Sequence, residues 1–255
     1  LVEPGWRVVA TAADHNATLR PLQALAVAGT IQLAIVPCDS GGVVDPDEVA
    51  AACLPGTRLV VFSHASNVTG ALQDAARIVA VARERGAATI VDAAQTAGIV
   101  PLPTDADIVV APGHKWLQGP QGMAWVAVRP GIEPRPLVRG GTGTGSESLA
   151  MPDALCDRLE AGTPDLAALA GFAAAVEWLE AWGAEGVAAA DRRLAALARE
   201  ALGALPGVRL LGAPGAGPPI VAFTVEGYDP AEVAVIVEQA EGIEARAGWH
   251  CAALV

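Results

Sequence analysis

The chain has 255 residues, of which 53% are hydrophobic, and its 16 basic and 28 acidic residues give a formal charge of −12. This length allows one large domain or two smaller ones with a sizeable core, and the composition is typical of a soluble α/β protein. No apolar run reaches the ~18 residues of a membrane span, and the negative charge disfavours nucleic acid or an anionic membrane as a partner.

Short β-branched runs alternate with Ala-rich stretches over the first half of the chain, which is typical of βαβ units. Strands are expected at residues 7–11, 31–36, 58–62, 89–92, 107–111 and 122–128, and helices near 18–28, 46–53 and 72–85. Most of these strands lack polar alternation, so we expect both of their faces to be buried. The sequence therefore predicts an α/β fold with a mostly parallel central sheet sandwiched by helices.

The second half has longer helices and fewer strands. Amphipathic helices are expected over residues 165–182 and 184–205, and Pro206-Gly207 ends the second one. Strands at 208–211 and 220–225, a helix at 229–240 and a final strand at 243–246 follow. We therefore expect a large domain over residues 1–177 and a smaller α+β domain over residues 178–255.

The cysteines and the ends of the chain carry further expectations. Four cysteines (Cys38, Cys53, Cys156 and Cys251) show neither C-x-x-C pairing nor the density of a disulfide scaffold. We therefore expect a reducing compartment, the cytoplasm. The sequence has no initiator Met and no signal peptide, and it opens and stops in mid-motif. We expect a chain that is truncated at both ends.

Four polar segments directly follow expected strands, at residues 14–16, 64–70, 92–95 and 113–115. In an open parallel sheet, ligands bind beyond the carboxyl ends of the strands. Polar groups from four separate segments are therefore expected to converge in one crevice.

Lys115 is the only lysine, whereas the other basic residues are all arginine. Arginine can neither deprotonate nor become an imine nitrogen, but a lysine in a desolvated site can do both. A lone lysine in a Gly/Pro-rich turn behind a strand therefore suggests a function that needs a primary amine. The alternative is a solvated turn lysine.

Asp92 ends the apolar run Thr89-Ile90-Val91. A carboxylate in such a place needs a cationic or hydrogen-bonding partner, or its pKa shifts. One interpretation is a helix N-cap for the next turn. The other is a carboxylate that keeps a pyridinium nitrogen protonated.

Two other ligand classes are disfavoured. No two of the four histidines have the i, i+3 or i, i+4 spacing of metal-binding helices, so we expect no metal site and a structural role for His64. The glycine-rich residues 140–145 match neither of the nucleotide-binding patterns G-x-G-x-x-G and G-x-x-x-x-G-K-[ST]. A flexible loop near a dimer-shared site fits them better, with Thr142 as a candidate contact.

Five motifs occur in order along the chain, and they are specific only in combination. They are Ser63-His64-Ala65-Ser66-Asn67-Val68-Thr69-Gly70, Val91-Asp92-Ala93-Ala94-Gln95, Pro112-Gly113-His114-Lys115, Glu160-Ala161-Gly162-Thr163-Pro164 and Arg246-Ala247-Gly248-Trp249-His250-Cys251-Ala252. Together they resemble the cysteine desulfurase family, in the class-V aminotransferase branch of fold-type-I pyridoxal-phosphate (PLP) enzymes. The resemblance spans essentially the whole chain and implies the PLP-dependent transferase fold, with pyridoxal 5'-phosphate as cofactor.

The resemblance implies how the cofactor is held. Lys115 would form a Schiff base with PLP and later shuttle a proton, and Asp92 would pair with the ring nitrogen and so tune the cofactor. His15 would stack on the ring. Asn67 and Gln95 would hydrogen-bond the ring 3-oxygen.

It also implies the reaction and the assembly. Cys251 would be the thiolate that takes sulfur from L-cysteine as a persulfide and releases alanine, with Arg246 and His250 as candidate neighbours. From the residues alone, an inert buried cysteine is the alternative. His114 would reach the cofactor phosphate, and Thr163 would reach that of a neighbouring subunit, which implies an obligate homodimer. A sulfur-acceptor protein is a further expected partner.

The chain also departs from the family pattern. It lacks the segment whose Gly/Ser/Thr turn binds the PLP phosphate at a helix N-terminus, and the segment that supplies an arginine for the substrate carboxylate. Arg246 is therefore not assigned to that carboxylate. Trp116 stands where relatives often have a small residue, and Pro112 where some use serine. Alternative functions are a selenocysteine lyase, a class-V aminotransferase, or a truncated non-catalytic homologue that binds a partner.

Overall fold

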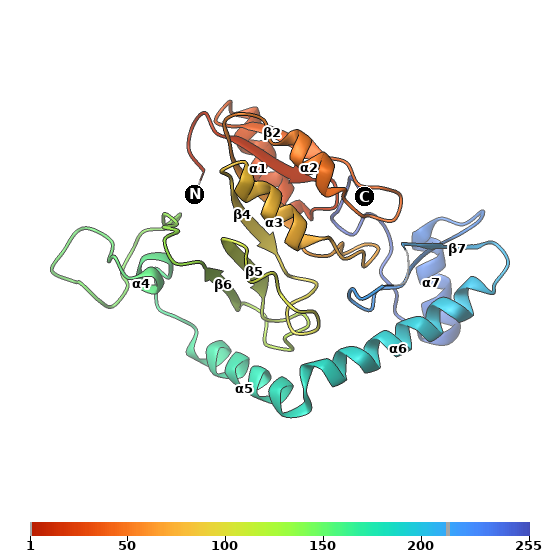
Figure 1. The fold of residues 1–255 in the computed structure, drawn as a ribbon. Helices are drawn as coiled ribbons and strands as arrows, with labels where there is room; N and C mark the ends of the chain where they lie inside the picture. The colour runs from red at the N-terminus through yellow and green to blue at the C-terminus, as the bar shows by residue number, and fades with distance from the viewer. Residues whose placement is uncertain (1, 213–214) are drawn as a thin grey trace.

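A computed structural model describes residues 2–212 and 215–255. Six strands form one sheet in the order β2-β1-β3-β4-β5-β6 (Figure 1). The first five run parallel and β6 runs antiparallel to β5. The strands are β1 (Arg7–Thr11), β2 (Gln32–Val36), β3 (Thr57–Ser63), β4 (Ala88–Asp92), β5 (Ile108–Pro112) and β6 (Ala124–Val128). The expectation of a mostly parallel sheet is confirmed.

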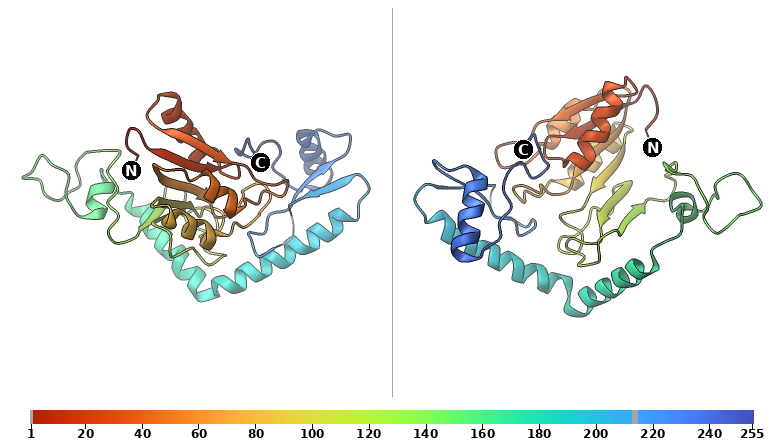
Figure 2. Two further views of the ribbon diagram at one scale, coloured as in Figure 1. Left: turned by 45° about the horizontal axis from the view of Figure 1, so that its top comes forward. Right: turned by 180° about the vertical axis from the view of Figure 1, so that it is seen from behind.

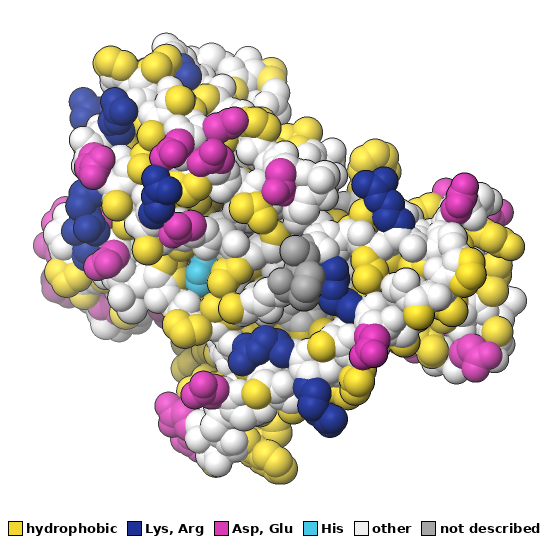
Figure 3. All heavy atoms as spheres, turned by 45° about the vertical axis from the view of Figure 1, so that its right-hand side comes forward, with side chains coloured by type: hydrophobic (Ala, Val, Ile, Leu, Met, Phe, Trp, Pro, Cys, Tyr) yellow, Lys and Arg dark blue, Asp and Glu magenta, His cyan; other side chains and the backbone are white. Residues whose placement is uncertain are grey.

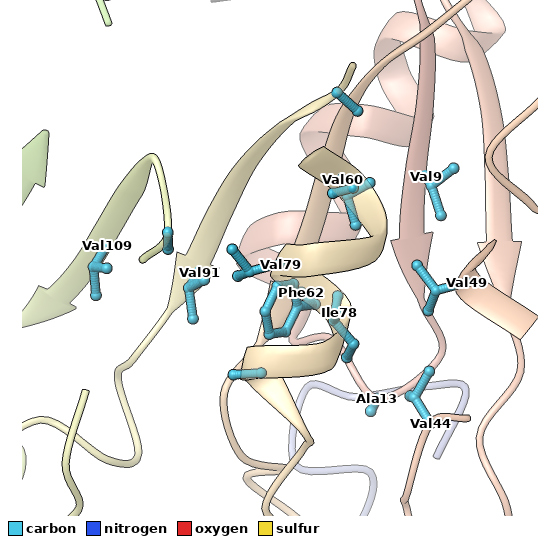
Figure 4. Close-up of a cluster of buried hydrophobic side chains, with 14 of the residues drawn as sticks. Val9, Ala13, Val44, Val49, Val60, Phe62, Ile78, Val79, Val91 and Val109 are labelled. Atoms are coloured by element: carbon cyan, nitrogen blue, oxygen red, sulfur yellow. The ribbon is translucent and has the colours of Figure 1, made fainter. Parts of the chain in front are cut away.

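Helices cover both faces of this sheet, because successive strand residues point to opposite sides. Val8 packs in a cluster with Leu19 and Leu22 of α1 (Asn16–Val27). The adjacent Val9 belongs to the opposite cluster, which α2 (Pro46–Ala52) and α3 (Ala75–Glu84) help to build and which Figure 4 shows. Both faces of β1 and β3 are therefore apolar and buried. The edge strands β2 and β6 are partly exposed, and the expectation of two buried faces holds for the central strands β1 and β3.

The start of α3 corrects one sequence expectation. Leu72 was expected in this helix, but it instead forms an isolated bridge with Ala65. The helix begins at Ala75 because the side chain of Asp74 accepts a hydrogen bond from the Arg77 main-chain nitrogen at 3.1 Å. An N-cap of this kind fixes the first turn of a helix.

The second half contains α4 (Leu155–Leu159), α5 (Leu166–Trp182), α6 (Ala184–Gly203), β7 (Val208–Leu211), β8 (Ala222–Val225) and α7 (Pro230–Glu241). The short helix α4 was not expected from the sequence. Figure 2 shows α5 and α6 as two arms that meet at an angle, and Gly183 between them has a φ of +77°. The expected division at residues 177 and 178 falls inside α5 and stays a prediction.

The expected strand at residues 243–246 is wrong. The helix α7 ends at Gly242, whose left-handed backbone turns the chain away, and residues 243–246 are exposed without a strand partner in the described part of the chain. The only sheet in this region with described strands is the antiparallel pair β7-β8. A strand needs a neighbour to satisfy its main-chain groups, and alternation alone does not supply one.

The surface carries hydrophobic, acidic and basic side chains side by side, as one face in Figure 3 shows. Several large apolar side chains from the segment after the sheet to the first residue of α5 are strongly exposed, among them Leu137, Leu149 and Leu166. Among the described residues, no helix combines the length and the apolar character that a bilayer crossing requires.

Candidate active site

The carboxyl ends of β1, β3, β4 and β5 lie next to one another, because these strands are parallel neighbours in the sheet. Each end is followed by one of the polar segments singled out in the sequence. His15 follows β1, Asn67 follows β3, Asp92 ends β4 and Lys115 follows β5. The strand order places these four segments at one edge of the sheet, and the expectation that their polar groups converge in one crevice stays a prediction.

Lys115 lies half-buried in a tight turn behind β5. The Gly113 nitrogen donates to Met123, and the Gly119 nitrogen donates back to Gly113, both at 2.8 Å. A Cβ on Gly113 would lie 3.0 Å from the ring of Phe172 in α5, so this turn needs glycine to pack there. Within residues 2–212 and 215–255, no carboxylate forms an ion pair with the Lys115 amine. The amine is therefore not committed to a structural salt bridge.

Asp92 uses one carboxylate oxygen locally. Its Oδ1 accepts a hydrogen bond from the Ala94 nitrogen at 2.8 Å, and turns rather than a helix follow. The interpretation of Asp92 as a helix N-cap is therefore wrong, because no helix follows it. Its side chain caps a turn instead. The described residues donate no hydrogen bond to the second oxygen, which leaves it available to a ligand.

His15 is electrostatically linked to both of these groups. Burial lowers the pKa of its imidazole, the positive charge of Lys115 lowers this pKa further, and the negative charge of Asp92 raises it. The ring also caps α1, because Nδ1 accepts a hydrogen bond from the Ala17 nitrogen at 3.0 Å. That bond requires an unprotonated Nδ1 and fixes the orientation of the ring. A flat imidazole with an unprotonated Nδ1 is therefore held at the same sheet edge as the amine of Lys115 and the carboxylate of Asp92.

Two side-chain amides lie on the loops after β3 and β4. Nδ2 of Asn67 donates to the His250 carbonyl oxygen at 2.7 Å, while its Oδ1 is buried without a hydrogen-bond partner among the described residues. Oε1 of Gln95 accepts from the Trp116 indole nitrogen at 3.2 Å. A buried polar atom without a partner is costly, so the unpaired oxygen of Asn67 indicates a place where a ligand group belongs.

The C-terminal end of the chain returns to the region of the first βα unit (Figures 1 and 2). The Cys251 carbonyl oxygen accepts a hydrogen bond from the Asn16 nitrogen at 2.7 Å, and Arg246 Nη2 lies 3.7 Å from the Cys251 sulfur. Cys251 is exposed, so the inert buried cysteine is ruled out. His250 and Cys251 have φ values of +48° and +58°, in the left-handed region that residues other than glycine seldom adopt.

Two predicted site residues are not joined to this group by any contact in the described chain. His114 and Thr163 are both exposed, and their expected contacts with phosphate stay predictions. Thr142 is half-buried, and its hydroxyl hydrogen-bonds Thr144 within its own loop. No cluster of three or more metal-ligating side chains occurs in the described ranges.

The sequence analysis included Asp14 in a polar segment but gave it no role of its own, and the structure buries it fully between the ends of β1 and β3. Its carboxylate accepts hydrogen bonds from the Thr11 nitrogen at 2.8 Å and the Ser63 nitrogen at 2.5 Å, so it joins the ends of β1 and β3. Burial raises the pKa of Asp14 to about 7. The signal was present in the sequence, because Asp14 follows an apolar strand just as Asp92 ends one.

His64 connects two of the loops that carry the candidate site residues. It is buried, and its Nδ1 lies 2.9 Å from the Thr96 hydroxyl, which links the loops after β3 and β4. Burial lowers the pKa of His64 to about 4, so the ring is neutral at ordinary pH. These contacts support the structural role expected for this histidine.

Two surface hollows lie away from these residues. One of about 460 Å³ runs along α7 and is lined by Tyr228, Val235 and Ile236. The other, of about 100 Å³, lies between α6 and the loop after β3, beside Arg192 and Arg199. Neither contains an amine, a thiol or a carboxylate from the sheet edge. The candidate site is therefore defined by strand topology and side-chain chemistry.

The comparisons with known proteins assign the fold and the class. The whole chain, residues 1–255, matches the model of the aminotransferase class-V family, and it belongs to that family. Within the family, its sequence is similar to cysteine desulfurases. It is 35% identical over 260 residues to a probable cysteine desulfurase of Pseudomonas aeruginosa, an alignment that covers 98% of this chain and 63% of the relative.

Other relatives agree with this similarity. A probable cysteine desulfurase of Mycolicibacterium paratuberculosis is 31% identical, over 98% of this chain and 37% of its own length. The cysteine desulfurase CsdA of Escherichia coli has a solved structure that superposes with a TM-score of 0.88 at 28% identity, over 99% of this chain and 64% of that one. The chain spans 37–64% of the length of these curated relatives. The PLP-dependent transferase fold expected from the sequence is confirmed.

Proposed function

We propose that this chain is part of a PLP-dependent cysteine desulfurase that converts L-cysteine to alanine and leaves the sulfur on Cys251. The observation that carries the proposal is the strand order, which brings His15, Asp92 and Lys115 to the carboxyl ends of β1, β4 and β5 at one edge of the sheet. An amine, a carboxylate and a flat neutral ring at one sheet edge are the groups that a pyridoxal ring requires. A similar solved structure, 25% identical with a TM-score of 0.82, is a C-DES mutant with glycine covalently linked to its PLP cofactor.

The residues of this chain fit the cofactor in their chemistry. The free oxygen of Asp92 would hold the proton of the ring nitrogen, and His15 would stack on the ring. Gln95 and the second Nδ2 hydrogen of Asn67 would contact the 3-oxygen, His114 would reach the phosphate, and Lys115 would supply the amine of the Schiff base. When bound, PLP supplies an electron sink that weakens bonds at the substrate carbon atoms.

In the proposed reaction, the thiol of Cys251 is the group that takes the sulfur from the substrate. Its thiolate attacks the sulfur of L-cysteine, a sulfur–sulfur bond forms and the carbon–sulfur bond breaks. The electron pair of the broken bond stays on carbon, which takes a proton and leaves as part of alanine, while Cys251 carries the persulfide. A thiolate is required for this step. The guanidinium of Arg246, 3.7 Å from the sulfur, is placed to stabilise that anion.

The assembly and setting belong to the same proposal. Exposed Leu137, Leu149 and Leu166 flank the segment that carries exposed Thr163, and a second copy would cover this apolar surface. We therefore propose a homodimer in which Thr163 reaches the neighbouring active site. A sulfur-acceptor protein would then take the persulfide sulfur in the cytoplasm.

The test begins with purified protein and added PLP. The wild type should develop a visible absorbance band that Lys115→Ala and Lys115→Arg both lack, because arginine keeps the charge but cannot form an imine. Cys251→Ala should keep the band and lose sulfur transfer. Cys156→Ala is the matched control, since Cys156 is also exposed but lies on α4, and it should retain both properties.

Other outcomes separate the alternatives. Turnover of selenocysteine without Cys251 would indicate a selenocysteine lyase, and transfer of an amino group to a keto acid would indicate an aminotransferase. Absence of a band in the wild type would contradict PLP binding by this chain and favour a non-catalytic homologue. A band that survives in Lys115→Ala would remove the lysine assignment.

A further inference from the structure

A contact next to Lys115 joins two turns of the candidate site and has no role in the proposed function so far. Trp116 directly follows the lysine, and its indole nitrogen donates a hydrogen bond to Oε1 of Gln95 at 3.2 Å. Both side chains are half-buried. The turn after β4 and the turn after β5 are therefore linked through a polar side-chain contact.

The main chains of the two turns also pack closely. Gly98 has a φ of +100°, and a Cβ on it would lie 2.8 Å from the Trp116 carbonyl oxygen. A side chain at residue 98 would push the turns apart, so only glycine allows this approach. The close packing limits the movement of Trp116 relative to Gln95 and keeps the hydrogen bond within reach.

The chemistry of this contact determines which way the Gln95 amide faces. An indole N–H can only donate, so the atom that faces it must be the carbonyl oxygen of the amide. The two N–H donors on Nε2 therefore point away from Trp116. The described residues offer Nε2 no hydrogen-bond acceptor, which leaves these donors for a ligand.

We propose that Trp116 is a positioning residue that holds the Gln95 amide with its N–H₂ group toward the 3-oxygen of PLP. This inference rests on the proposed function and deepens it. A donor on the 3-oxygen stabilises negative charge there and lowers the pH at which the bound cofactor loses its proton. An amide that could rotate freely would present its oxygen part of the time, and that oxygen repels the 3-oxygen.

The test measures the pH midpoint of the visible band of the PLP-loaded protein. Trp116→Phe keeps the ring but removes the N–H, and Gln95→Leu removes the donor itself. Both variants should raise the midpoint by about half a pH unit or more, because one hydrogen bond to a charged group is lost or weakened. The double variant should match Gln95→Leu alone, since Trp116 acts only through Gln95. Trp178→Phe, on the exposed surface of α5, is the control and should leave the midpoint unchanged.

A second measurement on protein without cofactor separates this inference from the proposed function. The indole N–H resonance of Trp116, identified by its absence in Trp116→Phe, should move in Gln95→Leu. If it does not move, the contact is absent and the inference is overturned, whether or not PLP binds. A midpoint that is unchanged in Trp116→Phe, or that shifts further in the double variant than in Gln95→Leu, would also overturn it and leave Trp116 a packing residue. A wild type without a visible band would instead count against PLP binding.

Discussion

The side chain of Asn67 and the main chain of His250 meet across 183 positions of sequence, with Nδ2 donating to the carbonyl oxygen at 2.7 Å. This hydrogen bond connects the loop after β3 to the segment that carries Cys251. A second bond, from the Asn16 nitrogen to the Cys251 carbonyl oxygen, holds the same segment to α1. The proposed nucleophile is therefore anchored by two loops that also carry residues proposed to hold the cofactor.

The first prediction concerns this anchor. Asn67→Ala removes one of the two hydrogen bonds and should speed hydrogen exchange at the Ala252 amide about fivefold, from a net hydrogen-bond contribution of about 1 kcal/mol. Asn16→Ala is the matched control, because Asn16 contributes through its main chain and the alanine keeps that bond. Equal exchange rates in wild type and Asn67→Ala would show that the contact does not restrain the segment.

The second prediction concerns Asp14 and pH. Because burial raises the pKa of this carboxyl from 3.8 to about 7, the folded protein keeps a proton that the unfolded chain releases. The contribution of Asp14 therefore stabilises the fold below about pH 4 and is lost as the pH rises toward about 7. As the pH rises over this range, the free energy of unfolding of the wild type should therefore decrease relative to that of Asp14→Asn. The decrease should be about 1.4 kcal/mol per pH unit at most.

Urea unfolding at several pH values checks this expectation. Exposed Thr104, whose side chain does not titrate, provides the control, and the difference between wild type and Thr104→Val should stay nearly constant with pH. A difference for Asp14→Asn that is flat across the same range would mean that Asp14 titrates normally in the folded protein.

The third prediction concerns the support beneath the loops. Thr96→Val preserves the shape of a fully buried side chain but removes the hydroxyl that faces Nδ1 of His64. Leaving a buried polar atom unpaired should lower the free energy of unfolding by about 1–3 kcal/mol. Exposed Thr104 gives the control, and Thr104→Val should change this free energy by less than about 0.5 kcal/mol. An equally small effect of Thr96→Val would show that His64 finds another partner.

Some features could be predicted from the sequence because they depend on local pattern. Uninterrupted apolar strands indicated a sheet covered on both faces, and this topology alone brings His15, Asp92 and Lys115 to one edge. Contacts between distant segments could not be predicted in this way. No repeating pattern of residues in the sequence indicates the hydrogen bond from Asn67 to the His250 carbonyl or the positive φ of Cys251.

Two errors have the same physical origin. Residues 243–246 alternate as a strand does, but they have no neighbouring strand in the described chain. Leu72 has the helical spacing of the residues that follow it, but the Asp74 cap sets the start of α3 after it. In both cases, the residue pattern indicates only which structure the segment could adopt. The hydrogen bond of the Asp74 cap decides where α3 begins, and the lack of strand hydrogen bonds within the described chain keeps residues 243–246 from forming a strand.

The last prediction separates two roles of His15. The residue caps α1 through Nδ1 and is proposed to stack on the cofactor. Asparagine is a good N-cap but has no aromatic ring, so His15→Asn should keep the free energy of unfolding within about 0.5 kcal/mol of wild type, while His15→Ala should lose about 1 kcal/mol. In PLP-loaded protein, both variants should alter the visible band and slow alanine formation to a similar extent. Activity that falls only in His15→Ala would mean that the cap, and not the ring, is what the site requires.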